Sequence, residues 1–332
     1  VLSQDHQNLC PGTGGLFFMH TPGLRITGRS LQEHPEQLTE SLELARNLGF
    51  RAVEMVPDDF ELISCARVNM NNLNQLKAVL DEYKFRISIH APLRLNLMDR
   101  EDPLLHLEVL SCCAEICRHL RAEILVCHPG RYVDNVYFHR YGRPMDHMDD
   151  NTMQKLRHQE RNMIEGLARK FPDITFALEN HRPYLHHSPY SYGEKIESLV
   201  QTLEDMDRPN IKMTLDTGHL NLAASFYKQD ILEDVSLALP WIAHVHVHDN
   251  HGITSYYTEK DKVGMLPFGR GDEHDIPGSG TFPFADFFSL LEGYPGIYLL
   301  ELTQRYLYPA RIQQGMKSMN RFLNQAGSGQ DK

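Results

Sequence analysis

The sequence predicts an α/β protein built as a single closed (β/α)8 TIM barrel. Short β-rich runs alternate with amphipathic helical patterns, eight such runs can be counted, and no linker-like stretch divides the 332 residues. The runs are nearly continuous in Val, Ile and Leu, which is typical of parallel strands covered on both faces. Eight strand–helix cycles favour a closed barrel over an open doubly wound sheet, which stays the alternative.

The elements follow one another in a regular order. The predicted strands occupy residues 16–21, 51–57, 86–92, 123–129, 175–181, 212–218, 242–250 and 297–303. Apolar residues at i, i+3 and i+4 predict helices over residues 35–49, 71–84, 103–120, 152–170, 193–206 and 284–293. We expect one domain over residues 1–332 with its core at about 16–325, and extended loops at 130–150, 181–193 and 250–271 on the active-site face.

The composition narrows the class of protein and its partners. Hydrophobic residues make up 41% and charged residues 23%, as in ordinary globular proteins. The sequence contains no apolar run long enough to span a membrane, and its first residues lack the features of a signal peptide, so we expect a cytoplasmic protein. The net charge of −11 argues against a protein that wraps nucleic acid, whereas 19 histidines suggest bound divalent cations. The oligomeric state is not predicted.

Metal-ligand side chains stand at the ends of six successive predicted strands, from the third to the eighth. They are His90, His128, Glu179, Asp216 with His219, His246 and Glu301. The carboxyl ends of barrel strands form one rim, so these side chains should converge on one pocket. An unpaired buried carboxylate costs roughly several kcal/mol unless a cation or strong donors compensate it. The pattern therefore predicts a metal site, although a lone His at a strand end is more often structural.

Two further segments add candidate ligands. Asp272 and His274 are two residues apart, so in an extended segment both side chains point to one side and suit a single ion. A solvated acidic loop is the alternative interpretation of that segment. His244, His246 and His248 alternate along one strand and should all face the barrel interior. His20, near the end of the first predicted strand, is a further candidate for the pocket floor.

These motifs resemble the xylose isomerase-like TIM-barrel superfamily (AP endonuclease family 2), and within it the endonuclease IV type of apurinic endonuclease. The matching motifs are His90-Ala91-Pro92, His128-Pro129-Gly130, Glu179-Asn180, Asp216-Thr217-Gly218-His219, His246-Val247-His248-Asp249, Asp272-Glu273-His274 with Gly278-Ser279-Gly280, and Glu301. All nine ligand positions of that family's trinuclear site are filled in order. The resemblance therefore implies up to three divalent ions, with zinc expected first and manganese or iron also suited to mixed His and carboxylate ligands.

The resemblance also implies how the ligands divide among the ions. His90, His128 and Glu179 would hold the first ion. Glu179, as a bridge, would hold the second together with Asp216, His246 and Glu301, and the third would lie among His219, Asp272 and His274. Such a centre implies a phosphoester hydrolase that uses metal-bound hydroxide.

The loops argue against bulk genomic DNA as the substrate. The loop after the second predicted strand, residues 57–68, begins with acidic residues, and no run of Lys or Arg with interleaved aromatics is present. Nucleic acid is therefore possible but not favoured, and a small anionic or sugar-like substrate is expected. Residues 250–271 are predicted either as a lid or as a mobile surface loop. The candidate substrate-binding residues are Arg131, Arg182, His248, Lys262 and Arg270.

An alternative function uses part of the same set. Superfamily members that act on sugars or sugar phosphates are isomerases and epimerases with one divalent ion, held by the residues that match Glu179, Asp216, His246 and Glu301. The two glutamates would then act as general acid and base, and His219 would contact substrate oxygens. The discriminator is the remaining quartet of His90, His128, Asp272 and His274, which a one-ion isomerase does not require. A metal-binding protein without catalysis is the third hypothesis.

Overall fold

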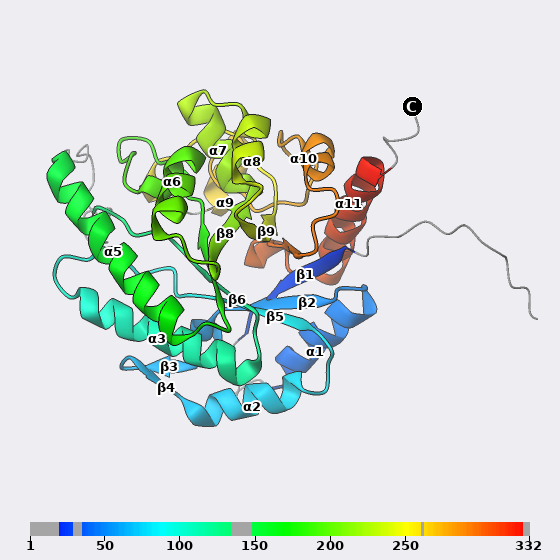
Figure 1. The fold of residues 1–332 in the computed structure, drawn as a ribbon. Helices are drawn as coiled ribbons and strands as arrows, with labels where there is room; N and C mark the ends of the chain where they lie inside the picture. The colour runs from blue at the N-terminus through cyan, green and yellow to red at the C-terminus, as the bar shows by residue number, and fades with distance from the viewer. Residues whose placement is uncertain (1–19, 29–34, 134–147, 260–261, 328–332) are drawn as a thin grey trace, which may run out of the picture.

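The computed structural model describes residues 20–28, 35–133, 148–259 and 262–327, and in these ranges the chain folds into a closed barrel (Figure 1). Eight parallel strands follow one another around the barrel in the order β1-β10-β9-β8-β7-β6-β5-β2. The strands are β1 (Thr21–Ile26), β2 (Ala52–Met55), β5 (Arg86–His90), β6 (Ile124–Cys127), β7 (Thr175–Glu179), β8 (Ile211–Asp216), β9 (Ile242–Val247) and β10 (Ile297–Leu300). This confirms the predicted (β/α)8 class.

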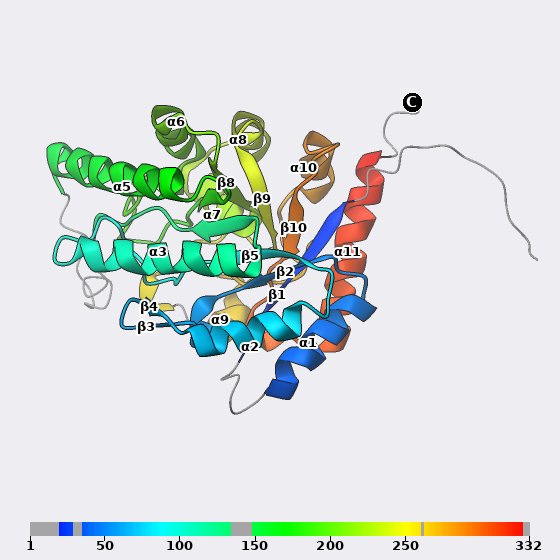
Figure 2. The same ribbon diagram turned by 60° about the horizontal axis from the view of Figure 1, so that its bottom comes forward.

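Helices surround the barrel on its outside, as both views of the ribbon show (Figures 1 and 2). They are α1 (Pro35–Asn47), α2 (Met70–Leu80), α3 (Pro103–Leu120), α5 (Asp150–Lys170), α6 (Ile196–Met206), α7 (Thr217–Tyr227), α8 (Ile231–Ala238), α10 (Phe284–Leu290) and α11 (Pro309–Gly327). Shorter pieces lie in the loops: η1 (Pro57–Phe60), a hairpin of β3 (Ile63–Ser64) and β4 (Arg67–Val68), η2 (Tyr192–Glu194), η3 (Tyr257–Glu259), α9 (Lys262–Met265), η4 (Leu266–Phe268) and η5 (Gln304–Tyr306). None of the described helices combines the length and apolarity needed to cross a membrane.

The buried apolar residues form two clusters, and the smaller one shows where the inner face of the barrel changes from apolar to polar. A large cluster packs the outer faces of the strands against the helices, with fully buried members such as Leu42, Leu76 and Ile116. A small cluster of alternate strand residues forms separately from it: Ala52, Ile124, Val126, Ala177, Ile297 and Leu299. Side chains two residues apart share one face of a strand. The next residues on this inner face, nearer the carboxyl ends, are therefore polar, for example Glu179 after Ala177 and Glu301 after Leu299.

The first strand lies later in the sequence than predicted. We expected residues 16–21, but β1 is Thr21–Ile26, and residues 16–19 lie outside the described part. The segment Thr-Pro-Gly looks like a turn, yet it pairs in parallel with β10 and β2. Gly23 is needed there because a Cβ would lie 2.9 Å from side-chain atoms of both Ile297 and Leu299. The end of β1 at the rim consequently presents Arg25, whereas His20 precedes the strand and packs edge-on against Tyr298; the expectation for His20 was wrong.

All seven later strands end two or three residues sooner than predicted. β8 stops at Asp216 instead of residue 218, β9 at Val247 instead of 250, and β10 at Leu300 instead of 303. After β8 the chain turns directly into α7, because the Asp216 side chain accepts a hydrogen bond from the His219 backbone N–H at 2.7 Å and caps the helix. The motif therefore spans a strand end and a helix start, which brings Asp216 and His219 to the same rim.

Candidate functional site

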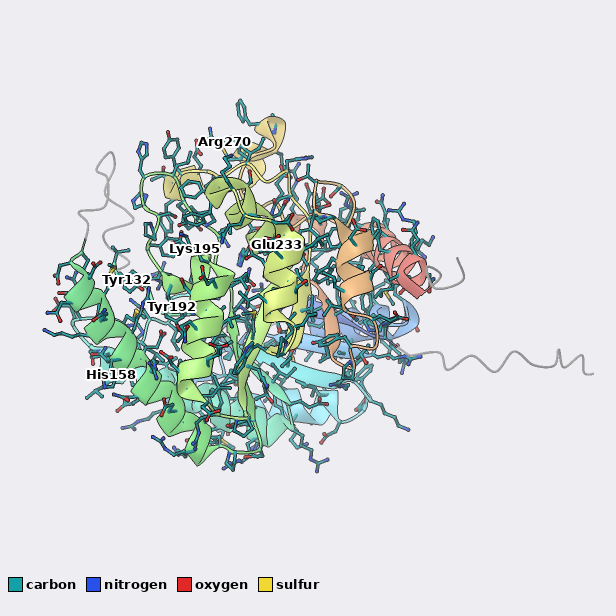
Figure 3. All side chains as sticks on the ribbon, turned by 45° about the horizontal axis from the view of Figure 1, so that its top comes forward. Tyr132, His158, Tyr192, Lys195, Glu233 and Arg270 are labelled. Atoms are coloured by element: carbon teal, nitrogen blue, oxygen red, sulfur yellow. The ribbon has the colours of Figure 1, made fainter. Side chains whose placement is uncertain are left out.

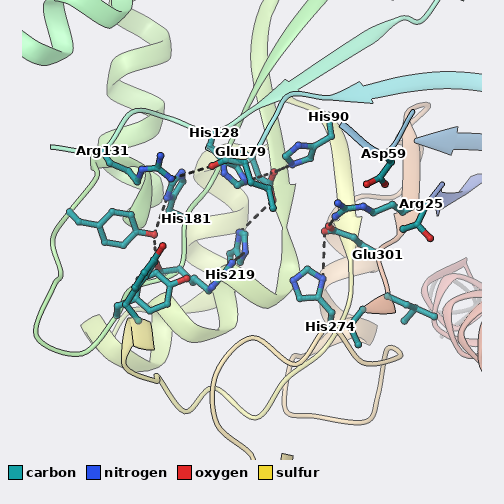
Figure 4. A pocket seen from close by; sticks show the side chains of 18 of the residues that line it. Arg25, Asp59, His90, His128, Arg131, Glu179, His181, His219, His274 and Glu301 are labelled. Atoms are coloured by element: carbon teal, nitrogen blue, oxygen red, sulfur yellow. Dashed lines mark hydrogen bonds and ion pairs between the residues drawn. The ribbon is translucent and has the colours of Figure 1, made fainter. Parts of the chain in front are cut away.

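A cavity of 330 Å³ opens at the carboxyl ends of the strands (Figure 4). Six of the nine predicted ligands line it: His90, His128, Glu179, His219, His274 and Glu301. Asp216, His246 and Asp272 do not line the cavity but are buried next to these six. The structure thus brings all nine predicted residues together, and their role as metal ligands stays a prediction.

The first cluster consists of His90, His128 and Glu179. Nε2 of His90 lies 3.0 Å and Nε2 of His128 lies 3.1 Å from Oε2 of Glu179. Burial lowers the pKa of His128 to about 4 even though the nearby Glu179 charge opposes this shift. His128 is therefore neutral at pH 7, with its ring nitrogen available as an electron-pair donor.

The central cluster consists of Glu179, Asp216, His246 and Glu301, whose ligand atoms all lie within 4.8 Å of one another. Nδ1 of His246 is 3.3 Å from Oε1 of Glu179 and 3.2 Å from Oε2 of Glu301. Burial alone would raise the pKa of Glu179, but the charges of His246 and His128 hold it well below its ordinary value. The same balance lowers the pKa of Glu301, chiefly through His246 and His274. Three buried carboxylates gathered around one imidazole suit one divalent cation.

The third cluster consists of His219, Asp272 and His274. Oδ2 of Asp272 lies 2.6 Å from Nε2 of His274 and 3.4 Å from Nε2 of His219. A cationic side chain is already present here, since Nη1 of Arg182 lies 3.0 Å from the same Oδ2 and also contacts Nε2 of His219. The residues fit a metal ion by type and spacing, but such an ion would have to compete with Arg182 for two of its three donors.

The comparison with known protein families agrees with this geometry. A family model described as xylose isomerase-like TIM barrel matches residues 42–322. The chain belongs to this family. The relationship confirms the superfamily that the strand-end motifs indicated.

The chain is also distantly similar to several individual proteins. The uncharacterized protein MJ1311 of Methanocaldococcus jannaschii is 27% identical over 275 residues, which cover 80% of each chain. An inosose dehydratase of Clostridium perfringens is 26% identical over 122 residues, or 34% of this chain and 40% of that protein. Among solved structures, a D-tagatose 3-epimerase-like protein has a TM-score of 0.65 and 24% identity, covering 93% of this chain and all of its own. An L-ribulose 3-epimerase has a TM-score of 0.64 and 14% identity, covering 95% and 100%. These structural similarities show the fold.

Among the site residues of this xylose isomerase-like barrel, Glu54 and Arg25 were missed in the sequence, and so was His181, which lines the cavity. Glu54 of β2 is fully buried and accepts hydrogen bonds from Ser88 Oγ at 3.0 Å and from His244 Nε2 at 3.0 Å, and its Oε1 lies 3.2 Å from Nε2 of His246. Arg25 of β1 forms an ion pair with Glu301 and lines the cavity. Glu54 could have been noticed as an acidic residue inside the otherwise apolar run of β2. Arg25 was not considered because the first strand was predicted at residues 16–21, before Arg25.

The predicted substrate-binding residues are distributed unevenly. Arg131 and Arg182 line the cavity. His248 is fully buried, stacks on His274 with ring centroids 3.9 Å apart, and places Nε2 2.9 Å from Oδ2 of Asp216. Gly218 makes room for that ring, because a Cβ there would lie 2.0 Å from Cε1 of His248.

The loop over residues 250–271 contributes less than predicted. Tyr257 lines the cavity. Arg270 instead pairs with Glu259 at 3.2 Å and packs on Tyr256. It is not part of the cavity wall, and Figure 3 shows Arg270 near the edge of the molecule in that view. Lys262 begins α9, and its side chain lies outside the described part of the structure.

Proposed function

We propose that this protein is a divalent-metal-dependent sugar isomerase or epimerase, or acts on a closely related polyhydroxylated substrate. The observation that carries the proposal is the central cluster, in which Glu179 and Glu301, both on the cavity wall, lie close to the buried His246. Two carboxylates at one cavity are the acid and base that proton transfer at a carbon next to a carbonyl requires. The epimerase names of the two structural neighbours and the inosose dehydratase name of one relative support this choice.

The two glutamates are both ionised but are held in place by different side chains. Both have lowered pKa values, so each is ionised at neutral pH and can accept a proton from the substrate carbon. Glu179 is held through Oε2 by His90 and His128, while Glu301 is held by Arg25. One carboxylate would remove the proton and become a carboxylic acid, and the other would return a proton that it had first taken up from solvent. A divalent ion held by Glu179, Asp216, His246 and Glu301 would polarise the substrate carbonyl and acidify the neighbouring C–H bond.

The test is proton exchange at carbon, measured by NMR in D2O with protein loaded with Mn, Zn, Mg or Fe and a panel of ketoses and their phosphates. We expect deuterium to enter next to the carbonyl, and Glu179→Gln or Glu301→Gln to reduce its rate by about 10²- to 10⁴-fold. Glu123→Gln is the matched control, because Glu123 is exposed and pairs with Arg86 away from the cavity. Absence of exchange with every sugar and metal would refute the proposal.

A phosphoester hydrolase remains a second candidate because of one specific observation. His90, His128, Asp272 and His274 complete two further clusters around the central one, and a one-ion isomerase does not require them. Release of nitrophenol from bis(4-nitrophenyl) phosphate, together with no exchange on sugars, would favour this candidate. The reverse result would leave the quartet with a structural or substrate-binding role.

A further inference from the structure

Arg131 is a rigidly held arginine in the cavity wall, in the loop after β6. Its Nη1 donates to the carbonyl of Leu93 and its Nη2 to the carbonyl of Arg94, each at 3.2 Å. Its backbone is fixed as well by the side-chain amide of Asn96. The backbone N–H of Arg131 donates to Oδ1 of Asn96 at 2.8 Å, and Nδ2 of Asn96 donates to the carbonyl of Arg131 at 3.1 Å. The guanidinium is therefore oriented before any ligand arrives, which reduces the entropy lost on binding.

The charge of Arg131 has no carboxylate partner among the described residues. The other two arginines in the cavity wall do have one, because Arg25 pairs with Glu301 and Arg182 with Asp272. Nε of Arg131 is enclosed and forms no hydrogen bond within the described part of the chain. Burial lowers the pKa of Arg131, whereas the pKa values of the two paired arginines are raised. A fixed cation with a spare buried donor next to a cavity is the arrangement that binds an anion.

His181 lies on the same side of the cavity as Arg131, opposite Arg25 and Asp59 (Figure 4). The hydroxyl of Tyr190 donates its proton to the carbonyl of Arg182 at 2.8 Å, so it accepts from Nδ1 of His181 at 3.0 Å. The proton of the imidazole therefore sits on Nδ1, and Nε2 presents a lone pair. This Nε2 is buried and finds no donor among the described residues. It is an acceptor suited to a hydroxyl group.

We propose that Arg131 and His181 form a recognition subsite in which Arg131 binds an anionic group of the substrate and His181 accepts a hydrogen bond from one of its hydroxyls. The inference rests on the proposed function and names its substrate class, an acidic sugar. The negative group is a phosphate ester or a carboxylate, since the guanidinium fork binds both. The subsite borders the first cluster, because the rings of His181 and His128 lie 4.8 Å apart. One end of the substrate would thus be held while its carbonyl end reaches the central cluster.

The experiment is isothermal calorimetry on metal-loaded protein with fructose, fructose 6-phosphate and glucuronate, and with inorganic phosphate as the smallest probe. We expect at least one of the two charged sugars to bind more tightly than fructose. Arg131→Gln should weaken that binding by about 10- to 100-fold and leave fructose binding unchanged, as expected for a hydrogen bond to a charged group. A preference for the phosphate ester or for glucuronate identifies the anionic group.

Three controls separate the subsite from general effects. Arg94→Gln removes the same charge from an exposed side chain of the neighbouring loop and should not change the preference. Arg131→Lys keeps the charge without the fork and should give an intermediate loss. His181→Gln keeps an acceptor, whereas His181→Phe removes it, so only the Phe variant should weaken all the sugars. Circular dichroism confirms that each variant is folded.

The subsite and the proposed function fail in different ways. Equal binding of charged and neutral sugars by the wild-type protein, or an equal loss of both in Arg131→Gln, would overturn the subsite even if a neutral ketose is converted. Binding of a charged sugar that depends on Arg131, without proton exchange on any substrate, would support the subsite and count against the isomerase.

Discussion

Nη1 of Arg182 lies 3.0 Å from Oδ2 of Asp272, and the same guanidinium contacts His219. This ion pair places a protein cation at two of the three donors of the third cluster. Burial alone would lower the pKa of Arg182, but Tyr184 and the Asp272 carboxylate raise it. His274 and Arg182 in turn hold the pKa of Asp272 well below its ordinary value. The third cluster is therefore held together by charge pairing even without a metal ion.

This pair leads to a prediction about stability. Arg182→Gln leaves the buried charge of Asp272 without its arginine partner, so we expect the metal-free protein to lose about 3 kcal/mol of unfolding free energy in urea. Asp272→Asn should cost a similar amount. The double variant should be less damaging than the sum of the two, whereas strictly additive losses would contradict the coupling.

Metal content distinguishes the clusters. Elemental analysis of protein purified without chelator should show the largest loss of ions in Glu179→Gln, because Glu179 belongs to both the first and the central cluster. Asp272→Ala combined with His274→Ala should remove at most one ion, since only the third cluster loses two of its ligands. A content close to three ions per chain would favour the hydrolase, and about one ion retained after the double change would favour the isomerase. A Glu179→Gln protein with unchanged metal would refute both assignments.

Glu54 should control the affinity of the central cluster without binding the ion. Its carboxylate faces Nε2 of His246, and this directs Nδ1 of that ring toward Glu179 and Glu301. We expect Glu54→Gln to weaken metal binding by about 10- to 100-fold in a competition assay with a fluorescent chelator. Ser88→Ala removes a different hydrogen bond to Glu54 and should have a smaller effect. Equal effects would show that Glu54 acts only through packing.

Glu160 gives a prediction for the pH dependence of stability. This residue is fully buried near Gly130, whose N–H donates to it at 2.6 Å, and burial raises the pKa of its carboxyl from the ordinary 4.5 to about 7. The unfolded chain releases this proton at lower pH than the native protein does. Glu160 therefore makes stability fall as pH rises from about 4.5 to 7, by about 3 kcal/mol in all.

The matching experiment compares wild type with Glu160→Gln in urea at several pH values. The Gln variant retains an acceptor for the Gly130 N–H but cannot ionise. We expect its stability to be flatter between pH 4.5 and 7, and to exceed that of wild type above pH 7. Parallel stability curves for the two proteins would show that Glu160 does not titrate in this range.

Much of the site could be predicted because two regular features combine. The carboxyl ends of parallel strands lie at one rim of a barrel, and every second side chain of a strand points inward. Glu179 and Glu301, which stand at strand ends, are therefore expected to point into the same pocket. The first strand escaped prediction because Pro22 and Gly23 resemble a turn, and their fitness for a strand depends on Ile297 and Leu299 more than 270 residues away. Arg25 belongs to this strand and was therefore not predicted as a site residue.

Contacts made by loops could not be predicted in the same way. Arg182 and Asp272 meet through two loops whose paths no sequence period fixes, and the same holds for Arg131 with the carbonyls of Leu93 and Arg94. Glu54 was missed for another reason, since the sequence argument considered only strand ends. The inward position of Glu54, deeper in the barrel than the strand ends, follows from the same alternation of side chains that turns Glu179 and Glu301 inward.

Asp216 illustrates how closely the sequence at the rim is constrained. Its Oδ1 starts α7 by accepting the His219 N–H, while its Oδ2 faces His248 and His246 in the barrel. Asparagine would preserve the helix start but bring no negative charge, and glutamate would bring the charge on a side chain one carbon too long to cap. Only aspartate meets both requirements at once. A single side chain thus makes the local folding of α7 and the electrostatics of the barrel mouth inseparable, so neither can change in sequence without the other.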